Sequence, residues 1–153
     1  MTVVSQFMSD AVVTCRLTDT LQRAAHLMWD RDVGCLPVVD DENHLVGLIT
    51  DRDACMAAYQ RDEALRNIPV SAAMTARVYA CGPNDDLATV QRTMASHRVR
   101  RVPVLEASGE VVGILSLDDL ARAATTAHDL PMRDVIATMT MVSGIAAQVD
   151  SDT

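Results

Sequence analysis

The chain has few aromatic residues, an excess of negative charge and no long apolar run. Its 153 residues include one Trp, one Phe and two Tyr, so a flat ligand ring would be held by aliphatic contacts rather than by stacking. The formal net charge of −8 repels phosphate backbones and anionic lipid, which argues against binding to nucleic acid or to a membrane surface. A small anionic ligand would need only a local basic pocket.

No segment indicates export or a membrane span. The start, MTVVSQFMSD, lacks a basic region followed by a continuous apolar one. The longest uncharged stretch, residues 135–149, contains Thr, Ser, Gly and Gln and is too short and too polar to cross a bilayer. We therefore expect a cytoplasmic protein.

The cysteines and histidines form no recognisable catalytic or metal-binding motif. Four cysteines without C-x-x-C spacing are most simply buried thiols in a reducing cytosol. The four histidines are scattered without i, i+4 pairing, so we expect neither a metal site nor an enzyme. One alternative stays open. Cys15 ends one predicted strand and Cys35 begins the next, and if they meet, the chain could be a redox sensor linked by a disulfide or a metal.

The sequence is internally duplicated. Residues 4–59 align with residues 70–125 at a constant offset of 66 without a gap, and sixteen of the fifty-six aligned positions are identical. A chain of this length then divides one core between two halves. The predicted divisions are residues 1–66 for repeat one with its linker, 67–126 for repeat two and 127–153 for a helical tail.

Each repeat predicts the element order β-α-β-β-α, preceded by a short helical lead-in at 4–8 or 70–74. In repeat one we expect strands at 12–15, 36–39 and 45–49, a helix at 19–31 capped by Thr18 or Asp19, and a helix from Thr50 to about residue 59. In repeat two we expect strands at 78–80, 102–105 and 111–115, and helices at 87–96 and 116–125. Residues 60–68 form a polar linker. After Pro131 we expect an amphipathic helix that covers apolar surface or meets a second subunit.

The motif that most clearly predicts a binding site lies where each predicted hairpin ends and the following helix begins. Residues 47–53 read GLITDRD and residues 113–119 read GILSLDD, so both fit G-h-h-[ST]-x-x-D, where h is apolar. Thr50 and Ser116 are predicted N-caps, and Asp53 and Asp119 complete capping boxes. The same turn suits a ligand, because a helix N-terminus attracts an anion and a carboxylate on the first turn can bind the paired hydroxyls of a ribose.

Together with the segments that precede each hairpin, this motif resembles the cystathionine β-synthase (CBS) domain. The preceding segments are LPVVD at 36–40 and VPVLE at 102–106. The resemblance covers about residues 3–126, so the chain is similar to a stand-alone Bateman module. The implied fold class is α/β, more strictly α+β, with two tandem repeats packed about a pseudo-twofold axis and an added C-terminal helix.

The resemblance implies a regulatory ligand and no resident cofactor. CBS pairs bind AMP, ADP, ATP, S-adenosylmethionine or NAD-type molecules in two clefts between their repeats. By motif, Asp53 and Asp119 would hold ribose hydroxyls, and Thr50 and Ser116 would contact ribose or phosphate. The implied contacts to adenine include Val13, Cys15, Pro37, Val38 and Val78. Two modules commonly pair into a disc, so a homodimer that acts on an unidentified regulated protein is expected.

The two repeats differ before their shared Pro. Repeat one has Gly34 and Cys35 where repeat two has Arg100 and Arg101. Arginine binds phosphate oxygens bidentately, and the family's regulatory kinase subunit carries basic residues at these two positions. An arginine cluster at a helix end can also simply solvate the surface.

The two repeats also differ inside the motif. Arg52 beside Asp53 favours an anion in repeat one, whereas Asp118 beside Asp119 adds negative charge in repeat two. We therefore expect the cleft that uses Thr50 and Asp53 to bind phosphate better. A structural dimer with empty clefts is the remaining alternative.

Overall fold

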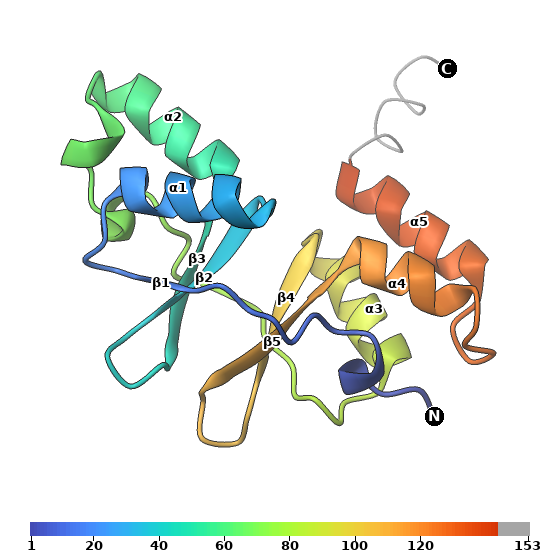
Figure 1. Cartoon of the computed structure of the whole chain (residues 1–153). Helices are drawn as coiled ribbons and strands as arrows, with labels where there is room; N and C mark the ends of the chain where they lie inside the picture. The colour runs from blue at the N-terminus through green and yellow to red at the C-terminus, as the bar shows by residue number, and fades with distance from the viewer. Residues whose placement is uncertain (144–153) are drawn as a thin grey trace, which may run out of the picture. The chain divides into compact units, whose positions relative to one another are not determined.

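The computed structural model describes residues 1–143 and divides into two compact units (Figure 1). The repeat-one unit consists of Ala11–Tyr79 with Ala107–Val111. The repeat-two unit consists of Met1–Asp10, Ala80–Glu106 and, among the described residues, 112–143. Each unit builds a core of its own, so each is described by itself.

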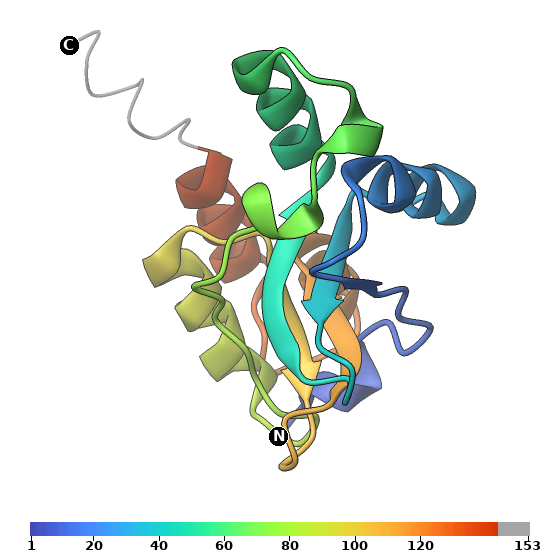
Figure 2. The same ribbon diagram turned by 90° about the vertical axis from the view of Figure 1, so that its left-hand side faces the viewer.

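The repeat-one unit is a three-stranded sheet with two helices. Its elements are β1 (Cys15–Arg16), α1 (Leu21–Arg31), β2 (Cys35–Val39), β3 (Leu45–Thr50) and α2 (Asp51–Arg61). The strand order is β1-β2-β3, with β1 parallel to β2 and β2 antiparallel to β3. In Figure 2 the hairpin turn after β2 lies at the end of the sheet away from α1 and α2.

Two local predictions for the repeat-one unit are wrong by a few residues. The first strand covers residues 15–16 rather than 12–15. Helix α1 is capped by Thr20, whose hydroxyl accepts a hydrogen bond from the Arg23 amide, and not by Thr18 or Asp19. The carboxylate of Asp19 instead accepts the Arg16 amide and closes the turn before the helix. Three neighbouring capping residues made the local signal ambiguous.

The repeat-two unit repeats the hairpin and its helices. Its elements are α3 (Leu87–His97), β4 (Arg101–Leu105), β5 (Val111–Ser116), α4 (Leu117–Ala124) and α5 (Met132–Ser143). The strand predicted at 78–80 does not form. Instead Cys81 makes a single parallel bridge to Val104, and the chain then turns at Pro83, which has no amide hydrogen to continue the pairing.

The short lead-in helices pack in the unit of the other repeat. Helix η1 (Val4–Gln6) contributes the fully buried Val4 to the repeat-two core. Helix η3 (Val70–Ala72) contributes the fully buried Val70 to the repeat-one core. In the sequence each lead-in directly precedes the rest of its own repeat. In the structure each lead-in packs in the core of the other repeat.

The residues between the repeats are not a purely polar linker. Helix η2 (Leu65–Asn67) packs on α1, and Ile68 is fully buried in the repeat-one core. The Leu21 amide donates to the Ile68 carbonyl at 2.8 Å, which ties the connection to the start of α1. The apolar residues at the end of this segment therefore belong to the fold of repeat one.

The helix predicted after Pro131 is confirmed as α5. It packs on α3 and α4, and its inner face buries Val135 and Thr138. The Gln91 amide group of α3 donates to the Thr138 hydroxyl and to the Asp134 carbonyl. Of the two predicted roles, α5 covers apolar surface of its own unit; residues 144–153 of the predicted tail lie outside the described residues.

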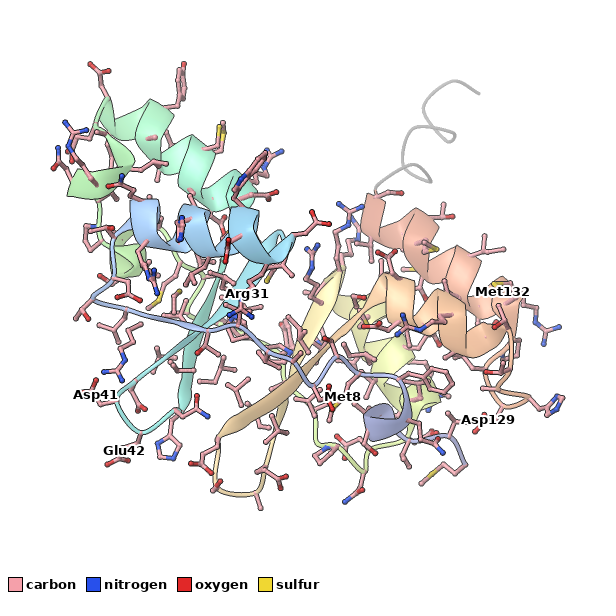
Figure 3. All side chains as sticks on the ribbon, viewed as in Figure 1. Met8, Arg31, Asp41, Glu42, Asp129 and Met132 are labelled. Carbon is pink, nitrogen blue, oxygen red and sulfur yellow. The ribbon has the colours of Figure 1, made fainter. Side chains whose placement is uncertain are left out.

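The chain before α5 is also tied to the N-terminus. Asp129, labelled near Met132 in Figure 3, accepts hydrogen bonds from the Thr2 hydroxyl at 2.5 Å and the Thr2 amide at 2.7 Å. These bonds hold the pKa of Asp129 below its ordinary value. The contact fixes the start of the chain to the loop that leads into α5.

Candidate ligand-binding site

The first motif turn forms the predicted capping box at the start of α2. The Asp53 amide donates to the Thr50 hydroxyl at 3.1 Å, and the Thr50 amide donates to Oδ2 of Asp53 at 3.0 Å. The Asp51 amide donates to the Gly34 carbonyl, and the Arg52 amide donates to the Asp51 carboxylate. The first amides of α2 are thus satisfied within the protein. Oδ1 of Asp53 makes no hydrogen bond or ion pair among residues 1–143.

The second motif turn forms the same capping box, but here both oxygens of the carboxylate accept hydrogen bonds. Oδ2 of Asp119 accepts the Ser116 amide at 2.8 Å and the Ser116 hydroxyl at 2.9 Å. Oδ1 of Asp119 accepts Nη2 of Arg122 at 2.7 Å, and the same Nη2 donates to the Phe7 carbonyl. Asp119 is buried, whereas Asp53 is half-buried. Two carboxylates with the same sequence motif therefore differ in their freedom to bind a ligand.

Arg122 is a residue that the sequence interpretation missed. It lies three residues after Asp119, and the aligned residue of repeat one is Met56. An i, i+3 pair of opposite charge on a predicted helix was the available signal. Such pairs contribute little to stability on an exposed helix. The Asp119–Arg122 pair is important here only because Asp119 is buried, which the sequence did not show.

The two predicted phosphate-binding arginines line a cavity of about 480 Å³ beside the start of α4. Arg100 and Arg101 share this cavity with Ser116 and with the carboxylate of Asp118. Among residues 1–143, neither guanidinium belongs to an ion pair. Leu117 of α4 and four residues of α5 complete the wall; those of α5 are Ile136, Met139, Thr140 and Ser143. The participation of α5 was not expected from the sequence.

The residues predicted to contact adenine all belong to the repeat-one unit. Cys15 on β1 pairs with Val38 on β2, and Pro37 precedes Val38 on the same strand. The side chains of Cys15 and Val38 are buried in the repeat-one core. Val13 and Val78 are half-buried in the same unit.

The two motif turns belong to a repeat that a known family model matches. A family model of the CBS domain matches residues 4–59 and residues 70–126. The chain belongs to the CBS domain family. The matched ranges begin where the lead-ins begin; the first ends in the last turn of α2 and the second ends just after α4, so the predicted pair of CBS repeats is confirmed.

Other CBS proteins are similar over most of the chain. CBS domain-containing protein YhcV of Bacillus subtilis is 37% identical over 123 residues, which are 79% of this chain and 84% of that protein. The solved CBS domain pair of protein MJ0100, in complex with 5′-methylthioadenosine and S-adenosyl-L-methionine, is 26% identical with a TM-score of 0.74 and covers 82% of this chain and 97% of that one. Hypoxic Response Protein I, solved with two coordinated zinc ions, is 29% identical with a TM-score of 0.71 over 79% of this chain and 98% of that one.

Neither a metal cluster nor a membrane helix is found in the described part of this CBS pair. Within residues 1–143 no three His, Cys, Asp or Glu side chains are grouped so that they could hold a metal ion. None of the helices in the same range combines the length and the apolar character needed to cross a membrane. The first finding gives no support to the metal-linked alternative.

The sheet register separates the two cysteines of the disulfide alternative. Cys15 lies opposite Val38, which is three residues from Cys35 along β2 and hence about 10 Å away. A disulfide requires Cα atoms within about 7 Å. Burial, with smaller contributions from Asp19 and from Cys35, raises the pKa of Cys15 to about 12, and burial with Asp85 does the same for Cys81. Reactive thiolates are therefore not favoured at either position.

These thiols predict a selective labelling pattern. At pH 8 about one in ten thousand molecules would carry a thiolate at Cys15 or Cys81, so only the exposed Cys55 should react quickly with iodoacetamide. Peptide mass spectrometry after a short pulse measures this, and Cys55→Ser should remove the fast reaction. Rapid native labelling of Cys15, or fewer than four thiols in the denatured, unreduced protein, would restore the redox alternative.

Proposed function

We propose that this CBS pair is a non-enzymatic regulatory module that binds an adenosine-containing ligand and changes the arrangement of a homodimer in response. The observation that carries the proposal is the unengaged Oδ1 of Asp53 at the start of α2. The adenosine-type ligands in the MJ0100 structure support it, because that CBS pair has the same fold. A ligand transmits a signal only through its different affinity for two arrangements.

The first turn is the preferred ribose site. Asp53 can accept a hydrogen bond from a ribose hydroxyl without losing its bond to the Thr50 amide, because one oxygen serves each partner. In Asp119 both oxygens already accept hydrogen bonds from the protein, so a ribose hydroxyl would have to share an oxygen with Arg122 or Ser116. The structural difference favours the same repeat as the charge difference between Arg52 and Asp118.

The arginine pair of the repeat-two unit is a second candidate anion site. Arg100 and Arg101 line their cavity without an ion pair among the described residues and beside the Ser116 hydroxyl. Asp118 in the same cavity opposes a high negative charge, so a monophosphate or diphosphate is favoured over a triphosphate. We therefore place AMP and ADP ahead of ATP, with S-adenosylmethionine and NAD as further members of the same ligand class.

Calorimetric titration of the full chain tests the proposal. AMP, ADP, ATP, S-adenosylmethionine and NADH are titrated in turn, and at least one should bind. Asp53→Ala should weaken that ligand at least tenfold, since a charge-assisted hydrogen bond to ribose is lost. Asp51→Ala is the matched control, because Asp51 is an exposed carboxylate in the same helical turn that takes no part in the capping box.

Two results would contradict this function. If none of the five compounds binds at millimolar concentration, the chain is better described as a structural CBS pair with empty clefts. If a compound binds with equal affinity to wild type and Asp53→Ala, the ribose assignment is wrong. A matched loss in Asp51→Ala would mean that only the net charge of the turn matters.

A further inference from the structure

The outer face of α5 is apolar and exposed. This helix lies beyond residue 126, where the CBS family model ends, so it is an addition to the repeat. Its inner face packs on α3 and α4, as described above. On its outer face, Met132, Ile136 and Met139 follow one another at helical spacing and are 40%, 56% and 37% exposed. These three residues form an apolar row on a helix that is already packed on its other side, and such a row marks a surface for a further partner.

The apolar row leads into the arginine cavity. Ile136 and Met139 belong both to the row and to the wall of the cavity that Arg100 and Arg101 line. Among the described residues that line this cavity, Asp118 is the one carboxylate, so the cavity has an excess of positive charge in a chain whose net charge is −8. The surface thus combines an apolar row with a local positive charge.

This combination indicates the chemistry of the partner. Methionine and arginine are enriched in protein interfaces, and a methionine side chain adapts its shape to the surface it meets. Two guanidiniums without an ion pair among residues 1–143 favour carboxylates, which arginine binds bidentately. The row from Met132 to Met139 is about 10 Å long at 1.5 Å per residue, which matches two turns of the apolar stripe of another helix.

We propose that the outer face of α5, together with Arg100 and Arg101, binds an amphipathic helix of the regulated protein that carries Asp or Glu at the end of its apolar stripe. The stripe packs on the apolar row, and the carboxylates pair with the two guanidiniums. Because a ligand phosphate uses the same arginines, the ligand and the partner helix compete. The competition rests on the proposed function, whereas binding of the helix alone does not require the ligand.

Competition for the arginines gives the module a way to transmit its signal. A phosphate in the cavity removes the charge pairs and weakens the partner helix, and by linkage the bound helix weakens the ligand by the same factor. AMP should therefore displace the helix. Adenosine has the same base and ribose but no phosphate, so it should leave the helix bound.

Fluorescence anisotropy with the full chain and a panel of labelled peptides tests the surface. Each peptide is built from Leu, Ala, Gln and Glu with one leucine stripe, and the members differ in where a pair of Glu follows the stripe. We expect at least one peptide to bind, and its counterpart with Gln in place of the two Glu to bind about tenfold more weakly or worse. AMP, but not adenosine, should displace the acidic peptide.

Variants locate the peptide on the molecule. Ile136→Ser and the double variant Arg100→Gln/Arg101→Gln should each raise the dissociation constant of the acidic peptide about tenfold or more. The double variant Arg23→Gln/Arg66→Gln is the control for charge, since it removes two exposed arginines of the repeat-one unit and should bind the peptide like the wild type. Circular dichroism checks that all variants are folded.

Several results would overturn the proposal. One is a panel in which no peptide binds, and another is equal binding to the wild type and to Arg100→Gln/Arg101→Gln. Peptide binding that appears only after Asp150→Asn and Asp152→Asn would assign the arginines to the chain's own acidic residues. Self-association in sedimentation velocity that Ile136→Ser abolishes would assign the face to a second copy. AMP that binds without displacing the peptide would contradict the competition. A peptide that binds when no nucleotide does would contradict the proposed ligand and leave the helix-binding surface standing.

Discussion

Asp119→Ala is expected to destabilise the protein by about 2 kcal/mol, and Asp53→Ala by about 1 kcal/mol. Both substitutions remove half of a capping box. In the second repeat, Asp119 is also buried, accepts the Ser116 hydroxyl and pairs with Arg122, so more partners are left unsatisfied. The order for stability is thus the reverse of the order for ligand binding, where Asp53 is the important carboxylate.

Urea unfolding of each variant measures this difference. Asp118→Ala is the matched control, because Asp118 is exposed and takes no part in the capping box; it should change the free energy of unfolding little. Arg122→Met introduces the residue of repeat one and should cost only about 0.5 kcal/mol, since the Arg122 side chain is 65% exposed. Equal losses for Asp53→Ala and Asp119→Ala would show that the extra bonds of Asp119 contribute nothing.

Gly47→Ala is expected to destabilise the protein by about 2 to 3 kcal/mol. A Cβ at Gly47 would lie 2.9 Å from the Thr75 carbonyl oxygen and 2.9 Å from Sδ of Met74. The oxygen belongs to a backbone bridge, in which the Leu48 and Thr75 amides each donate to the other residue's carbonyl, so it cannot move without breaking the pairing. The lost packing should appear as a lower midpoint in urea or thermal unfolding.

Gly113→Ala provides an informative comparison. There the worst contact is with Sδ of Met8 at 2.5 Å, while the backbone oxygen of Ser9 is 3.1 Å away. Met8→Ala should therefore rescue much of the Gly113→Ala loss, whereas Met74→Ala should rescue little of the Gly47→Ala loss. Gly82→Ala, whose nearest contact would be 3.4 Å, should be almost neutral. If Gly47→Ala is as mild as Gly82→Ala, the lead-in does not pack as described.

Local signals predicted the second helix of each repeat accurately, but not the edges of the sheets. Thr50 and Ser116 each combine a capping side chain with an aspartate three residues later, and both helices begin immediately after them. The strand expected at 78–80 depended on partners elsewhere in the chain, and β-propensity alone did not supply them. An element was therefore predictable where the hydrogen-bond partners that begin it lie within a few residues of one another in the sequence.

The sequence predicted which residues form the candidate site, but not which of its carboxylates has an oxygen free to bind a ligand. The motif itself identified Asp53 and Asp119 alike, and only the charges of the neighbouring Arg52 and Asp118 distinguished the two turns in the sequence. Their difference arises from Arg122 and from burial, which depend on packing around α4. The contribution of α5 to the arginine cavity was hidden for the same reason, since a helix outside the repeat has no counterpart to compare.

The exchanged lead-ins bear on how such a chain can arise. A single repeat would leave the place beside its own glycine empty, because Met8 packs beside Gly113 and Met74 beside Gly47. In two separate copies of one repeat, the first ten residues of each copy could pack beside the glycine of the other, as exchanged segments do in a domain-swapped pair. Joining the genes of such a pair would preserve every one of these contacts. The tandem sequence thus has the connectivity of an intertwined dimer that became one polypeptide.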